Sequence, residues 1–155
     1  MALFTAKEDE FMRKQKLCVI GTLQKDGYMH MAPIRCNFNG KNVYIPTHAK
    51  RKKIKNLKYN SKVSVMLGRY HNDQKQAEGV LVQGKAQVLK QGKEYLATGE
   101  AIGIKENGFD AKKKLYMYGP YVQYIIKVTP ERKASWGVNH AYRGVVHYRK
   151  TGKID

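Results

Sequence analysis

A run of cations lies at positions 50–53, between two short apolar segments. It opens a polar stretch, 49–60, in which Ile54 and Leu57 are spaced as on one edge of a short helix. Backbone N–H groups and the helix dipole make a helix N-terminus favourable for anions, so cations gathered there oppose the dipole. A bound phosphate would resolve this misfit. The alternative interpretation is a solvated basic face or a nucleic-acid patch.

The charge balance of the whole chain points to anionic partners. The 155 residues include 30 basic and 12 acidic side chains, a formal net charge of +18. Nucleic acid, an acidic membrane or phosphorylated small molecules would suit such a chain. No apolar run approaches the ~20 residues of a transmembrane helix, and charges at positions 7–10 interrupt any signal-peptide core. We therefore expect one cytoplasmic domain over residues 1–155, with no membrane association.

Residues that could bind a metal or act as nucleophiles show no recognisable spacing. Cys18 and Cys36 lie in expected strands without CxxC spacing, so we expect reduced core thiols. The histidines form no HxxxH or HExxH pattern; they are His30, His48, His71, His140 and His147. We find no Ser/His/Asp, Cys/His or paired-carboxylate constellation. The sequence therefore predicts neither a metal site nor a catalytic side chain.

The elements that must hold the anion site are mostly strands. Alternating or β-branched segments predict strands at 17–23, 28–38, 43–47, 63–67, 79–89, 121–129 and 133–138. Asp26-Gly27 and Asn39-Gly40 are hairpin turns. Pro33 indicates a bulge or an unpaired edge, because proline cannot donate to a ladder, and Gly84 indicates a bend.

Short helices and one corner complete the expected fold. Thr5 and Glu8 form a capping box for a helix at 5–15. Further helices are expected at 49–60, 93–102 and 111–118, and a corner at 130–132. Antiparallel hairpins with short helices predict a mainly β protein, a small barrel rather than a doubly wound sheet. No GxGxxG is present, which argues against a dinucleotide-binding unit.

Several segments, in their order and spacing, resemble the pyridoxamine phosphate oxidase-like family between about residues 17 and 137. Residues 47–64 resemble its flavin-phosphate segment: a strand ending in Thr, a (Ser)-Arg-Lys turn, a short helix and Asn-Pro-Arg-Val-Ser. Here Arg51 replaces the usual Ser, Lys52 the Arg and Ser61 the Pro. Residues 21–34 resemble the opening hairpin, 80–86 the central strand ending Gly-Lys-Ala, and 128–137 the closing corner with Ser-Trp-Gly.

The resemblance implies an antiparallel split β-barrel of the FMN-binding type, a homodimer holding two flavin mononucleotides between its subunits. The residues implied to hold the phosphate are Thr47, Arg51, Lys52 and Lys53. Those implied to lie along the isoalloxazine ring and ribityl chain are Pro33, Ile34 and Arg35. Trp136 would wall the flavin edge or the substrate pocket, with a place in the core or the dimer interface as the alternative.

Two departures from the family pattern argue against pyridoxamine phosphate as the substrate. His140 and Arg143 follow Trp136, but not at the spacing of the oxidase's substrate-binding pair. Residues 92–119 also lack its Arg-Pro-Arg pattern.

Three functions follow as hypotheses. The first is an FMN-dependent oxidoreductase that transfers hydride between a nicotinamide or organic substrate and the flavin, which carries the chemistry; a deazaflavin with a phosphodiester tail is the variant cofactor. The second is a flavin-binding or haem-handling protein without turnover. The third is a nucleic-acid-binding barrel that uses the basic run and the tyrosines; the lack of an RNP-like aromatic motif disfavours it.

Overall fold

The computed structural model describes residues 2–140, 147–150 and 153–154. Its strands are β1 (Leu17–Leu23), β2 (Met29–Arg35), β3 (Asn37–Phe38), β4 (Val43–His48), β5 (Lys62–Arg69), β6 (Glu78–Leu89), β7 (Phe109–Asp110), β8 (Leu115–Tyr118), β9 (Tyr121–Trp136), β10 (His147–Lys150) and β11 (Lys153–Ile154). Its helices are α1 (Ala6–Lys14), α2 (Lys52–Tyr59) and α3 (Lys93–Ala101), with 3-10 turns η1 (Gln74–Gln76) and η2 (Ile104–Asn107). None of these helices is long and apolar enough to cross a bilayer.

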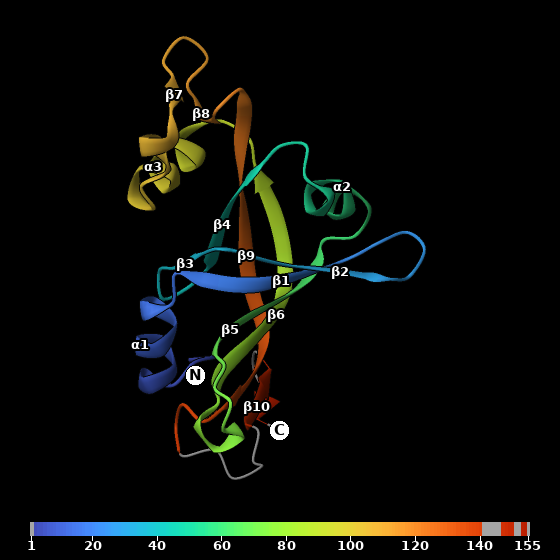
Figure 1. The fold of residues 1–155 in the computed structure, drawn as a ribbon, viewed down its shortest axis with the longest axis vertical. Helices are drawn as coiled ribbons and strands as arrows, with labels where there is room; N and C mark the ends of the chain where they lie inside the picture. The colour runs from blue at the N-terminus through green and yellow to red at the C-terminus, as the bar shows by residue number, and fades with distance from the viewer. Residues whose placement is uncertain (1, 141–146, 151–152, 155) are drawn as a thin grey trace.

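The strands form an antiparallel split β-barrel, as expected. The main sheet runs in the order β11-β10-β9-β6-β5-β1-β2, and β4 joins it through β9. Figure 1 shows β6 and β9 as long strands along the vertical axis, with β1 and β2 crossing in front of them. Interior side chains from β1, β4, β5, β6 and β9 make one core cluster, which α1 and α2 extend through Phe11 and Ile54.

The longest strand crosses the position where the sequence predicted a corner. β9 continues through Pro130 and pairs with β6 on both sides of it. The register shifts between Gln83 and Gly84, so Gln83 faces Arg132 while Gly84 faces Pro130. A Cβ at Gly84 would collide with the carbonyl of Thr129, which explains the glycine. The predicted corner at 130–132 is therefore wrong: it is a bulge within one strand, and the predicted bend at Gly84 belongs to it.

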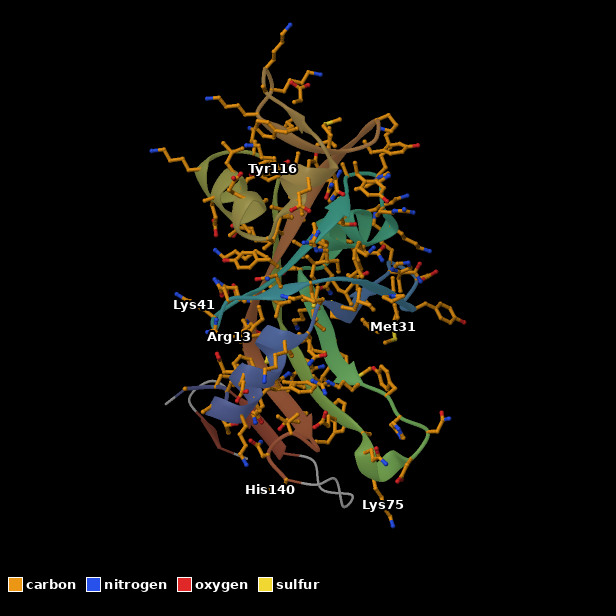
Figure 2. The ribbon with its side chains drawn as sticks, turned by 60° about the vertical axis from the view of Figure 1, so that its left-hand side comes forward. Arg13, Met31, Lys41, Lys75, Tyr116 and His140 are labelled. Atoms are coloured by element: carbon orange, nitrogen blue, oxygen red, sulfur yellow. The ribbon has the colours of Figure 1, made fainter. Side chains whose placement is uncertain are left out.

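The segment expected to form a helix at 111–118 is instead the β7–β8 hairpin. Tyr116 explains the difference. Its backbone N–H donates to the hydroxyl of Tyr95 at 2.8 Å, and its own hydroxyl donates to the carbonyl oxygen of Leu96 at 2.5 Å. Figure 2 places Tyr116 beside α3, and the ring is buried there. Partners about 20 residues away thus override a weak local helix pattern.

The predicted strand 28–38 is divided in two at Cys36. β2 pairs with β1, whereas β3 pairs with β4, so the chain exchanges one neighbour for another at this residue. β2 ends the main sheet, and Pro33 therefore faces a partner on one side only. The predicted edge position of Pro33 is confirmed. This edge strand, together with the end of β4 and the start of α2, surrounds the candidate site.

Candidate functional site

A cavity of about 540 Å³ lies between β2, the end of β4 and the first turn of α2. Seven of the eight residues predicted to contact a cofactor line it: Pro33, Ile34, Arg35, Thr47, Arg51, Lys52 and Lys53. The other lining residues are His30, Ala32, Pro46, His48, Asn107, Tyr118 and Gln123. This volume is within the usual range for small-molecule sites. The fold brings the seven predicted residues together around one cavity. Their roles as cofactor contacts stay predictions.

Helix α2 is held so that its N-terminus borders this cavity. Ile54 and Leu57 are buried in the core, and the Asn56 side-chain amide donates to the Thr22 hydroxyl of β1 at 3.0 Å. The N-cap residue, Arg51, makes no capping hydrogen bond with its side chain, and the first turn contains no acidic residue. The first helical N–H groups that reach a carbonyl are those of residues 54 and 55. The N–H groups of residues 52 and 53 are thus available to an anion.

Lys53 lies at this N-terminus and is the most unusual residue of the site. Only 5% of it is exposed, yet its side chain makes no hydrogen bond or ion pair within the described part of the chain. Burial lowers its pKa, and the nearby charge of Arg51 lowers it further, whereas Cys18 acts in the opposite direction. The ammonium nitrogen is not among the buried unpaired atoms, so it reaches the open cavity rather than the closed core. An anion in the cavity would supply the missing partner.

The floor of the cavity comes from β2 and β4. Thr47 is buried near the end of β4, where it pairs with Tyr124 of β9. On β2, Arg35 points its guanidinium group toward α3, and its Nη2 donates to the carbonyl oxygen of Ile102 at 2.6 Å. This bond ties the end of the edge strand to the segment after α3. The floor is therefore fixed at both strands before any ligand binds.

Two histidines of the cavity were not predicted as site residues. Nδ1 of His30 and Nδ1 of His48 are buried, and neither has a hydrogen-bond partner among the described residues. The pKa of each is lowered, first by burial and then by nearby positive charges, which are lysines for His30 and Arg51 with two lysines for His48. Strand alternation could have identified His30, because it shares a face of β2 with Ala32 and Ile34. His48 directly follows Thr47, which is a weaker signal.

The electrostatic character of the cavity is uniform. Four of its lining residues are Arg or Lys, and none of the described lining residues is Asp, Glu, Ser or Cys. Nor do the described residues bring three His, Cys, Asp or Glu side chains together as for a metal ion. The arrangement can bind an elongated anion with its charged group at α2. It offers no carboxylate base or protein nucleophile, so redox chemistry there would depend on the bound molecule.

Trp136, the eighth predicted residue, does not line the cavity within one chain. It ends β9 opposite Gly79 of β6, and a side chain at Gly79 would collide with its indole ring. Gln123, at the cavity, is thirteen positions earlier on the same strand, a separation of roughly 40 Å at strand spacing. The structure thus puts Trp136 at the other end of the barrel. Arg143 lies outside the described residues.

The sequence matches a known family, pyridoxamine 5'-phosphate oxidase, over residues 4–132. The chain belongs to this family. The matched part contains every lining residue of the cavity. It ends before Trp136, so the match does not extend to the predicted tryptophan contact. A search of curated proteins found no match to this sequence.

Solved structures with the same fold are distant in sequence. A haem binding protein from Mycobacterium smegmatis has a TM-score of 0.69 at 14% identity, over 95% of this chain and 58% of that one. General Stress Protein 26 from Bacillus anthracis has a TM-score of 0.66 at 17% identity, over 93% and 97% of the two chains. An F420 reductase has a TM-score of 0.58 at 15% identity, over 81% and 94%. At such identities these likenesses establish the split-barrel fold and no more.

Proposed function

We propose that this member of the pyridoxamine 5'-phosphate oxidase family binds FMN in the cavity between β2, β4 and α2, and that it is a flavin-dependent oxidoreductase. The observation that carries the proposal is Lys53: its stem is buried at a helix N-terminus, and its ammonium group has no partner among the described residues and borders a cavity. When bound, the flavin would supply hydride or electron transfer between a nicotinamide donor and a small-molecule substrate. The chain's own residues would bind it, orient it and exclude water.

The phosphate would lie at the start of α2. The backbone N–H groups of residues 52 and 53, the Thr47 hydroxyl and the ammonium group of Lys53 are the donors available there. Arg51 and Lys52 add positive charge at the rim. The uncharged remainder of the molecule would extend along Pro33 and Ile34 of β2, toward Arg35.

A deazaflavin is the alternative cofactor. The similarity to an F420 reductase gives one reason to test it. The other is the surplus of cations: exposed Lys50 lies near His48, a lining residue, and would attract a longer phosphodiester tail. Similarity to a haem binding protein makes haem a third molecule to test.

We further propose that the chain acts as a homodimer in the cytoplasm, with residues 1–155 as one cofactor-binding domain. Members of the family are typically dimeric. The outer face of β1 and β2 exposes Leu17, Met29 and Met31, each more than half exposed; Figure 2 labels Met31 at this surface. An exposed apolar face of this kind suits a stable interface. In a dimer, Trp136 of one chain could reach the cavity of the other, which a single chain does not allow.

Titration of the cofactor-free protein tests the proposal. FMN and riboflavin carry the same ring and ribityl chain, but only FMN has the phosphate. We expect FMN to bind at least about tenfold more tightly, since a hydrogen bond to a charged group contributes about 1.5–3 kcal/mol. Equal affinities would contradict a phosphate site at α2. Tight binding of haemin with no binding of FMN would replace flavin with haem as the cofactor.

A further inference from the structure

His48 occupies a restrained position at the edge of the cavity. It ends β4, directly after Thr47, and its backbone carbonyl accepts the N–H of Arg51 at 3.0 Å as the chain turns into α2. Its ring stacks on Tyr121 of β9 with centroids 4.1 Å apart and planes 23° apart. The stack fixes the plane of the imidazole, and so fixes the direction of both ring nitrogens.

The two nitrogens of His48 differ in their surroundings. Nδ1 is buried and has no hydrogen-bond partner among the described residues, whereas Nε2 is not among the buried unpaired atoms and the residue lines the cavity. A neutral imidazole carries its proton on one nitrogen only. Burying an N–H group without an acceptor is the less favourable choice, as orphaned donors are rarer in proteins than orphaned acceptors. The proton therefore belongs on Nε2, facing the cavity.

The surroundings of His48 disfavour a second proton on its ring. Lys50, Arg51 and Lys53 approach it from the turn and from α2, and Tyr121 covers it from β9. Burial, followed by these three cations, lowers the pKa of His48. A second proton would also have to sit on Nδ1, where no described acceptor is available. An anion in the cavity would offset the cations but would not provide that acceptor.

We propose that His48 contacts the cofactor directly, donating its Nε2–H to an oxygen of the anionic ligand. This inference rests on the proposed function, since it assigns a residue to the same site. It gives the site a donor that neither adds charge nor titrates when the ligand binds. The Arg and Lys side chains would attract the anionic ligand, and the hydrogen bond from His48 would orient it.

Two substitutions separate the hydrogen bond from the ring. His48→Phe keeps an aromatic ring against Tyr121 but removes the donor, so FMN affinity should fall about ten- to a hundredfold. His48→Gln keeps an amide donor at a similar distance from the backbone, so affinity should stay within about threefold. His71→Gln, in an exposed loop before η1, is the control and should bind FMN as the unchanged protein does. An unaltered affinity in His48→Phe would overturn the proposal.

The protonation state is tested separately. Calorimetry of FMN binding at about pH 7, in buffers of different ionisation enthalpy, gives the number of protons taken up. The unchanged protein and His48→Gln should take up the same number, because any uptake at Lys53 is common to both. Nitrogen-15 NMR should show the Nε2-protonated tautomer before and after binding. One extra proton in the unchanged protein would refute the neutral imidazole.

A further titration distinguishes failure of the FMN assignment from failure of the His48 contact. If FMN did not bind at all, titration with inorganic phosphate would still report on His48. A phosphate-dependent shift of its Nε2 resonance would then keep the anion contact while removing FMN. No response of that resonance to either FMN or phosphate would overturn the contact itself.

Discussion

Replacing Lys53 by methionine should have opposite effects on binding and on stability. Methionine keeps most of the buried stem and removes the charge. FMN should bind about ten- to a hundredfold more weakly, the equivalent of one hydrogen bond to a charged group at about 1.5–3 kcal/mol. The cofactor-free protein should become somewhat more stable, because the ammonium group of Lys53 is partly desolvated and its side chain has no partner among the described residues. Loss of repulsion from Arg51 acts in the same direction.

The control for this substitution lies on the same helix. Lys58 is exposed near the C-terminus of α2 and does not line the cavity. Lys58→Met should change neither affinity nor stability appreciably. Affinity is measured by flavin fluorescence at one moderate salt concentration, since salt screens exposed charges. Stability is measured by urea unfolding of the cofactor-free protein.

Two results would refute the reasoning. Equal loss of FMN affinity in Lys53→Met and Lys58→Met would mean that the basic run is a diffuse surface and not a phosphate site. A less stable cofactor-free Lys53→Met protein would mean that the ammonium group has a stabilising partner. The second result would contradict the claim that Lys53 lacks an ionic partner in the cofactor-free protein, even if FMN affinity fell as expected.

Three further predictions concern assembly, Trp136 and pH. Light scattering should show a dimer at micromolar concentration. The substitution Met31→Lys puts a charge on the exposed β1–β2 face, so it should shift the dimer toward monomer. A monomeric unchanged protein would contradict the proposed interface. FMN should quench the fluorescence of Trp136 in the dimer, and the quenching should disappear in a monomeric Met31→Lys protein. Unfolding in urea should show stability falling as pH drops from about 7 to about 5.5. The pKa values of His30 and His48 in the folded protein lie below the ordinary 6.5. As pH falls, these histidines are therefore protonated in the unfolded chain before they are protonated in the folded protein, and this lowers the free energy of unfolding. The double substitution of both by glutamine should remove most of this loss, and an unchanged pH dependence would refute the assignment.

The residues of the proposed anion site could be grouped from the sequence because they are close together along the chain. Thr47 and residues 51–53 belong to one strand–turn–helix unit, whose local pattern survives folding. Alternation along β2 likewise places Ile34 toward the cavity, and proline chemistry places Pro33 at an unpaired edge. In both cases a short-range rule determines the geometry.

The parts that were missed depend on partners far along the chain. Tyr116 becomes part of a strand because Tyr95 and Leu96 offer it hydrogen bonds, not because of its neighbours in sequence. His48 acquires its fixed ring plane from Tyr121, 73 positions later. Trp136 was expected at the cofactor from its place in a motif, yet the length of β9 carries it away from the cavity of its own chain. Local sequence patterns do not identify contacts between residues that are far apart along the chain.

The most direct test of the cavity as a flavin-phosphate site is the identity of the small molecule that remains bound when the protein is purified under native conditions. Its mass and absorption spectrum can be measured after release by denaturation. We expect FMN, or a deazaflavin with a phosphodiester tail, at about one molecule per chain. Riboflavin without phosphate, or haem in stoichiometric amount, would contradict a flavin-phosphate site at Lys53.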